Sequence, residues 1–208
     1  MTIQLKEYDV HPRTIHQRCG ALALFAALIL SPAISFAQNL GGQAGAVQAT
    51  VFGLLGSFNV GLANTGTLTG PTDARQASDI SGNLLGALLA EVPHATAIGL
   101  GDSVASQASL ANLALSIAGS AIGADLVMAE AQAANGVGSG TSTVTNLVLN
   151  GVPVAISGEP NQVVGIPGGQ MIINQQQSTP GGIVVNALHV IVGGVADVVI
   201  GTATATAQ

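Results

Sequence analysis

The residues of this chain that could perform chemistry begin with Ser103, which follows Gly101 and Asp102 in a short polar run. A serine nucleophile needs a histidine to take its proton and a carboxylate to orient that histidine. Beyond residue 37 the only histidines are His94 and His189. A hydrolase site would therefore have to be assembled from Ser103, one of these two histidines and a distant aspartate.

The run Gly101-Asp102-Ser103 resembles the first block of the GDS-type esterases, but the Asp-x-x-His that those enzymes also require is absent. There is no Gly-x-Ser-x-Gly turn either, so we expect these residues to form a loop, since Asp and Ser favour turns. His189 alternates with Leu188 and Val190 in an apolar run and should point away from them. We expect it to be solvated or hydrogen-bonded rather than a general base.

Metal binding would depend on the eight acidic residues of positions 38–208, which are scattered along the chain. They form no Asp-x-Asp-x-Asp-Gly loop, so a calcium site would have to combine distant strands. Asp125 and Asp197 are the best pair for this, because they occupy equivalent places in two similar runs and could face each other. We expect instead that each begins a strand after a turn and bonds local backbone amides. No catalytic, cofactor-binding or metal-binding residue is assigned.

The composition of the chain excludes several functions. Of its 208 residues, 48% are hydrophobic, 7% charged and 2% aromatic, whereas about 25% of an ordinary soluble domain is charged. Residues 38–208 hold eight acids and one base, Arg75, which gives a formal net charge of −7. Nucleic acid is a poor partner, because phosphate binding needs clustered Lys and Arg. Glycan binding on stacked aromatic platforms is excluded, since these residues contain neither Trp nor Tyr.

The sequence around the candidate site residues predicts strands separated by turns. In residues 141–208 the Val and Ile runs are punctuated by turn signals that predict hairpins, namely Asn150-Gly151, Glu159-Pro160-Asn161, Pro167-Gly168-Gly169, Thr179-Pro180-Gly181-Gly182 and Gly193-Gly194. Residues 38–140 repeat the pattern in Ala, Gly and Ser, with one short helix expected at Ser81–Leu89. We predict an all-β fold, an antiparallel β-sandwich of short, small-residue strands whose sheets approach closely or curve. A β-solenoid is the alternative.

Two internal similarities accompany this pattern. The runs SLANLALSI, TNLVLNG and VNALHVIV each hold an Asn followed by alternating apolar positions, and Ala124–Met128 (ADLVM) is echoed by Ala196–Ile200 (ADVVI). Both Ala-Asp runs follow an Asn-bearing strand and a glycine turn, so the repeated unit is either a hairpin or the product of convergent strand chemistry.

The first 37 residues have the features of a cleaved signal peptide. Basic residues precede the apolar run ALALFAALIL, and Ser35 and Ala37 are the small residues expected before a cleavage site. The apolar run of about 10 residues is too short for a spanning helix, which needs ~20. We therefore expect cleavage after Ala37, no stable membrane insertion afterwards, and a single β domain at 38–208 that is secreted or lies at the cell surface.

A family resemblance covers most of that domain. The stretches VVNALHVIVGGVADVVIGTATA and NGVPVAISGEPNQVVGIPGGQMIINQQ resemble the choice-of-anchor P family, with GAVQATVFGLLGSFNVG and SAIGADLVMAEAQA matching its N-terminal half. The resemblance implies a bacterial exported β domain of unassigned biochemical function. It implies no catalytic residue, and this chain ends at the domain without the surface anchor that family members carry.

From these features we expect a secreted or cell-surface structural or adhesive domain that is not an enzyme and uses no cofactor. The alternatives are a calcium- or ligand-binding surface module, using Asp125 and Asp197, and the hydrolase built around Ser103. An envelope or matrix component is the expected partner. Self-association through a strand edge is a further possibility, because the run 181–207 carries no formal charge except Asp197 and would be exposed if the final strand lay at a sheet edge. The turn formers of Gly70–Asp73 also predict that Arg75 lies in an exposed loop.

Overall fold

The computed structural model describes residues 40–53, 56–84 and 86–208, so the expected signal peptide and the cleavage site after Ala37 lie outside the described residues. The described part contains no helix, and therefore none that could cross a membrane. Its strands are β1 (Leu40–Gly53), β2 (Gly56–Asn64), β3 (Ala74–Ser78), β4 (Ser81–Leu84), β5 (Leu88–Gly99), β6 (Ser103–Ile117), β7 (Ser120–Ala134), β8 (Val137–Thr145), β9 (Val148–Leu149), β10 (Val152–Pro153), β11 (Gln162–Ile166), β12 (Gly169–Thr179), β13 (Gly182–Val192) and β14 (Ala196–Ala207).

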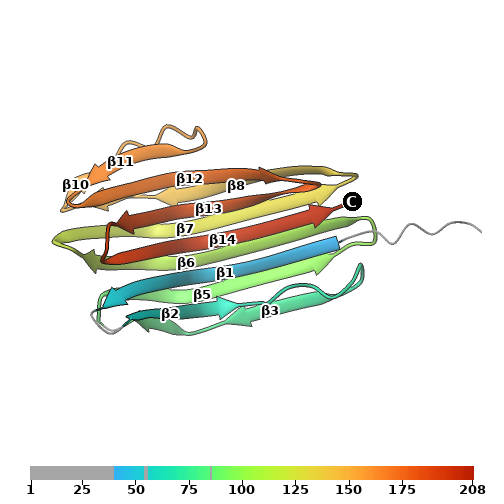
Figure 1. Ribbon diagram of the computed structural model, residues 1–208, viewed down its shortest axis with the longest axis horizontal. Coiled ribbons are helices and arrows are strands. Elements are labelled where there is room, and N and C mark those ends of the chain that lie inside the picture. Colours follow the sequence, from blue (N-terminus) through green and yellow to red (C-terminus); the bar gives the residue numbers. More distant parts are fainter. Residues whose placement is uncertain (1–39, 54–55, 85) are drawn as a thin grey trace, which may run out of the picture. The chain divides into compact units, whose positions relative to one another are not determined.

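These strands form two antiparallel sheets that pack face to face (Figure 1). Sheet A has six strands in the order β11-β12-β13-β14-β1-β2. Sheet B has eight, in the order β10-β9-β7-β6-β5-β3, with β4 also paired to β5 and β8 to β7. The predicted all-β antiparallel sandwich is confirmed, and the alternative β-solenoid is wrong, because solenoid strands stack in parallel.

The turn signals of the C-terminal part are confirmed. Asn150 and Gly151 join β9 to β10 with φ values of 51° and 78°, the left-handed pair that a two-residue hairpin of this type requires. Ile166 pairs with Gly169 across the next turn, and Val192 pairs with Ala196 across the glycine pair that precedes β14. The strands are not all short, however, because β6 and β7 each run for 15 residues.

The helix expected at Ser81–Leu89 is wrong. This segment is a tight hairpin, in which Ser81 of β4 pairs with Glu91 of β5 and the turn lies around Gly86. The Gly86 N–H donates to the Asn83 side chain at 2.9 Å, and Gly86 has a φ of 70°. A short apolar run fits a strand as well as a helix by periodicity alone, and here Asn83 and Gly86 decide for the turn.

The two zones of composition do not correspond to the two sheets. Strands β1 and β2 come from the Ala- and Gly-rich zone, yet they complete sheet A beside strands of the Val- and Ile-rich zone. The zone boundary after Gly140 falls inside β8. Strands of both zones therefore contribute to the same sandwich.

A row of irregular residues crosses sheet A at the middle of its strands. In each of five neighbouring strands, one residue is missing from the otherwise continuous series of paired positions. From β2 to β12 these residues are Ala63, Ala46, Gly201, Ala187 and Asn174. Three of them, Ala63, Gly201 and Asn174, have φ values of 45°, 66° and 52°. This left-handed conformation is costly for most L-residues, and only Gly and, less often, Asn adopt it readily.

Sheet B has a matching row. Asn112 in β6 has a φ of 48° and lies opposite Asp125 of β7, where the register skips from Ala111–Leu126 to Leu113–Ala124. Val92 in β5 and Asn146 after β8 continue the row, with φ values of 45° and 52°. We call the two rows together the crease.

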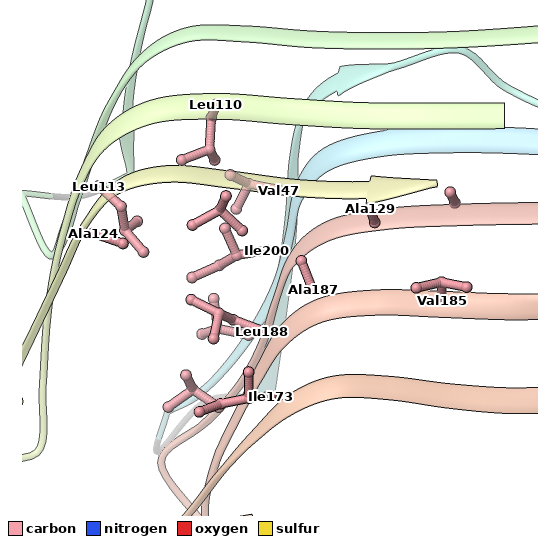
Figure 2. Packing of buried hydrophobic residues seen from close by; sticks show 14 of the residues in the cluster. Val47, Leu110, Leu113, Ala124, Ala129, Ile173, Val185, Ala187, Leu188 and Ile200 are labelled. Carbon is pink, nitrogen blue, oxygen red and sulfur yellow. The ribbon is translucent and has the colours of Figure 1, made fainter. Parts of the chain in front are cut away.

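The crease changes which residues face the core. In each of these strands one residue is left out of the pairing, while the register of the pairs on either side stays the same. The two-residue alternation shifts by one position there, so the set of buried residues changes parity. In β14 the buried residues are Ala196, Val198 and Ile200 before Gly201, and Ala203, Ala205 and Ala207 after it. Figure 2 shows the strands of sheet A bending where Ile173, Leu188 and Ile200 stack.

The crease also divides the core by side-chain size. The leucine half contains large residues, among them Leu88, Leu113, Leu115, Ile122, Met171, Ile173, Leu188, Val190, Val198 and Ile200. The alanine half is dominated by Ala44, Ala95, Ala97, Ala108, Ala129, Ala131, Ala133, Ala203, Ala205 and Ala207. Gly138 of β8 lies so close to the backbone of Gly182 in β13 that no Cβ would fit between them, so here the sheets are closer than the ~10 Å typical of packed sheets. The close approach expected from the small residues is thus confirmed.

Candidate functional site

The residues that a hydrolase would need are not brought together. Ser103 and His94 lie in sheet B, but His94 pairs with Ser109 in the ladder between β5 and β6. Ser103 lies six residues before Ser109 in β6, a separation of roughly 20 Å in a regular strand. His189 belongs to β13 in the other sheet. Neither histidine is hydrogen-bonded to a serine among the described residues, so their geometry gives the hydrolase alternative no support.

The run Gly101-Asp102-Ser103 is the connection between β5 and β6, as the turn interpretation required. The Leu100 N–H donates to the Ser103 carbonyl at 2.8 Å, and the Gly101 N–H donates to the Pro71 carbonyl at 2.9 Å. Gly101 has a φ of 80°, which suits glycine at a tight turn. Ser103 is thereby the first residue of a strand, and its backbone closes the hairpin.

His189 points outward from sheet A, while Leu188 and Val190 are buried, as their alternation predicted. Its Nδ1 lies 2.9 Å from Gln175 Oε1 and its Nε2 lies 2.7 Å from a carboxylate oxygen of Asp197. Gln175 Oε1 also accepts from Asn186 Nδ2 at 2.7 Å. The ring is thus held between an amide oxygen and a carboxylate on the outer face of sheet A.

Asp125 and Asp197 do not face each other, so the calcium arrangement is wrong. Asp125 lies on the outer face of sheet B and accepts from Asn146 Nδ2 at 2.6 Å. Asp197 lies on the outer face of sheet A, where it bonds His189. The expectation that both bond local backbone amides is also wrong. No group of three metal-ligating side chains occurs in the described part of the chain.

The two Ala-Asp runs also differ in their position within their hairpins. Asp125 is the sixth residue of β7, whereas Asp197 is the second residue of β14. Both runs do follow an Asn-bearing strand, in the hairpins β6–β7 and β13–β14. A hairpin repeat with a fixed register is therefore not supported.

Arg75 is not in an exposed loop. It is the second residue of β3, half-buried, and its Nε donates to Asp73 Oδ2 at 2.9 Å. The same oxygen accepts from the backbone N–H and the hydroxyl of Thr69, both at 2.8 Å. The backbone hydrogen bond from Thr69, with those from Arg75 and the Thr69 hydroxyl, lowers the pKa of Asp73 from 3.8 to about 2. The turn formers of Gly70–Asp73 set up this ion pair.

The C-terminal strand does not offer a free edge. β14 lies between β13 and β1 in the middle of sheet A (Figure 1), so the condition for pairing two copies through this strand, a position at the sheet edge, is not met. At the true edges, side chains occupy some of the free backbone groups. Asp79 accepts from the Ala63 N–H of β2 at 3.1 Å, and Gln176 donates to the Gly140 carbonyl of β8 at 3.1 Å. Such capping discourages strand addition.

The outer face of sheet A carries an extended polar surface. Two open hollows of about 450 and 290 Å³ share Gln48 and Val199, and together they run across β2, β1, β14 and β13. We call this surface the trough. Its side chains are mainly amides and hydroxyls, namely Gln43, Gln48, Thr50, Asn59, Asn64, Asn186, Thr202 and Thr204, with Asp197 as the carboxylate and Ala49, Val60, Val184 and Val199 as apolar members.

The trough follows the crease, and glycine shapes its floor. Gly45 faces outward in β1, and a Cβ there would lie 3.1 Å from the Gln48 amide nitrogen and 3.4 Å from Thr202 Cγ2. Part of the polar rim is internally bonded, since Thr50 donates to the Asn59 side chain at 2.7 Å. The Gln48 amide, in contrast, has no hydrogen-bond partner among the described residues, although it lines both hollows.

Sequence reasoning missed the trough for a physical reason. Gln43 and Gln48 are five residues apart in β1, as are Asn59 and Asn64 in β2. In a regular strand, an odd separation places two side chains on opposite faces. Only the change of parity at the crease brings each pair to the same face. The Asn residues that precede alternating apolar positions, such as Asn112 and Asn146, were the available signal of that change.

Comparisons with protein-family models, with curated proteins and with solved structures returned no match to this chain.

Proposed function

We propose that residues 38–208 form an exported structural or adhesive β domain of a bacterial envelope or extracellular matrix, without catalytic activity. The observation that carries this proposal is the trough, an open and nearly uncharged hydrogen-bonding surface that crosses four strands. Enzymes enclose their reacting groups in pockets with a few convergent polar groups. A shallow surface of amides and hydroxyls is better suited to holding a partner than to transforming it.

Two features of the sequence support the same proposal. Residues 1–37 have the order of basic, apolar and small residues of an export signal. The resemblance to the choice-of-anchor P family, in residues such as Asn186–Val190 and Ala196–Ile200, implies an exported bacterial domain. The separation of Ser103 from both histidines agrees with a role that needs no reaction.

To test the proposal, the full chain is expressed with a C-terminal tag in a bacterial host. Medium, envelope and cytoplasm are then compared by immunoblot. We expect the mature protein outside the cytoplasm, partly retained on the envelope, and Gln48→Ala to shift it toward the medium. The matched control is Gln132→Ala, which removes an exposed amide from the outer face of sheet B. A protein that stays in the cytoplasm with residues 1–37 attached contradicts the proposal.

A further inference from the structure

We infer that the trough is a binding site for a neutral, hydroxyl-rich polysaccharide. This inference rests on the proposed function and names the class of partner that the adhesive surface takes. It depends on three properties of the trough: its donors and acceptors, its charge, and its open length.

The donors and acceptors of the trough suit hydroxyl groups. Each amide and each hydroxyl can both donate and accept a hydrogen bond, as a sugar hydroxyl does. Gln48 lies where the two hollows meet, and its amide has no partner among the described residues. In the hydrogen bonds that Asn59 and Asn64 make with described residues, their side-chain oxygens accept, which leaves their NH₂ groups to donate to a ligand.

The charge of the trough selects a neutral polymer. Arg75 is the single Lys or Arg of the described residues, and it lies in sheet B bonded to Asp73. The trough thus offers no Lys or Arg to a phosphate, sulfate or carboxylate group, and its one carboxylate, Asp197, is hydrogen-bonded to His189. Acidic polysaccharides, nucleic acid and anionic lipid surfaces are disfavoured for this reason.

The shape of the trough favours a sugar chain over a peptide. It crosses four strands, which spans three inter-strand spacings or roughly 14 Å, and it is open along this length. Specific peptide binding depends on buried anchors such as Trp, Tyr or Arg and the pockets that they fill, and the trough has no deep apolar pocket. Val184 and Val199 offer only small apolar patches, which suit the C–H faces of sugar rings. Because no aromatic platform is present, each contact is weak, and retention depends on many copies binding one polymer.

The test is affinity electrophoresis of the purified mature domain in native gels containing dextran, a galactomannan or a soluble β-glucan. A gel with alginate, an acidic polysaccharide, serves as the comparison. We expect at least one neutral polymer to slow the wild-type protein, and alginate not to. Gln48→Ala should weaken binding about tenfold, since it removes about two hydrogen bonds. Gln132→Ala should bind as wild type does.

A second variant keeps the inference testable if Gln48→Ala fails to fold. Thr204→Val keeps the β-branched shape in the other hollow and removes only the hydroxyl, and it should also weaken binding. Thermal melts of all variants establish that they are folded. Equal retardation of wild type and both trough variants, retardation by alginate alone, or no retardation by any neutral polymer would overturn the inference. If Gln48 still governs envelope retention in that case, the partner is of another class and the adhesive function stands.

Discussion

The two halves of the sandwich, on either side of the crease, fill the space between the sheets with side chains of different size. In the leucine half, large side chains such as Leu188 and Ile200 fill the space between the sheets. In the alanine half the sheets come so close that several positions tolerate only glycine. A Cβ on Gly42 would lie 2.6 Å from Val104 Cγ1, and one on Gly138 or Gly140 would collide with Gly182 or Val185.

Because their side chains differ in size, the two halves are stabilised by different interactions. Burying a Leu or Ile side chain contributes about 1.5–3 kcal/mol, so the leucine half holds most of the hydrophobic free energy per residue. An Ala side chain contributes much less, and the alanine half depends more on close van der Waals contact and on regular backbone hydrogen bonds. An apolar hollow of about 320 Å³ opens at the end of the leucine half, lined in part by Leu88, Leu115 and Val198. Truncation and enlargement should therefore have opposite relative costs in the two halves.

The largest effect is expected from Leu188→Ala in the leucine half. Leu188 is fully buried beside the crease, and truncating such a side chain costs about 2–5 kcal/mol of the free energy of unfolding. Urea denaturation followed by circular dichroism measures the change. Val199→Ala, on the outer face of sheet A, is the control and should change stability by less than about 0.5 kcal/mol. A cost for Leu188→Ala as small as that of the control would contradict the assignment of the hydrophobic free energy to this half.

The next effect is expected from Ala205→Leu in the alanine half. Ala205 has no exposed surface and faces sheet B, where the close approach leaves no room for three further carbon atoms. Overpacking of this kind costs about 1–3 kcal/mol. The control is Thr204→Leu, which enlarges the neighbouring side chain on the outer face. If Ala205→Leu proved neutral, the sheets would be able to separate in this half, and its tight packing would not be a requirement of the fold.

Sequence reasoning reached the fold class and the turns of the C-terminal part because those signals are local. Asn150-Gly151 needs no tertiary context to form a hairpin, and its type was predictable. The crease was not predictable, because it forms only when the strands pair. In sheet A, for example, Asn174, Ala187 and Gly201 lie apart in sequence and become one row only through the pairing of β12, β13 and β14. The position of β14 in the middle of sheet A likewise depends on β1, which is about 150 residues away in sequence.

The crease contains one residue whose type conflicts with its backbone, and this conflict gives the next prediction. Val92 has a φ of 45° and is 62% exposed, and a β-branched residue in this conformation is an outlier. Val92→Asn introduces the residue found at Asn112 and Asn146 in the same row, and it should raise stability by about 1 kcal/mol. Differential scanning calorimetry measures the shift.

The control for this change is Val137→Asn, at an exposed position of β8 that does not have a positive φ. There the substitution removes a good strand former without relieving strain, so stability should fall slightly. Equal effects of the two substitutions would mean that the left-handed backbone at position 92 is not strained. The crease would then be a property of the sheet as a whole rather than of the residues in it.

The smallest effect concerns the end of the alanine half, where polar contacts hold a turn against the end of β5. Asp73 accepts from Thr69 and Arg75, and its pKa is lowered to about 2 from 3.8. Since the folded state binds the proton less tightly than the unfolded state, the carboxylate stabilises the fold above pH 3.8, and this contribution is lost as the pH falls toward 2. Asp73→Asn should therefore lower the Tm at pH 7, and its difference from wild type should shrink between pH 4 and pH 2. Asp102→Asn is the matched control, because no described residue hydrogen-bonds that carboxylate. A Tm difference for Asp73→Asn that stayed constant from pH 7 to pH 2 would show that the turn is held by packing, as in the leucine half, and not by this charged acceptor.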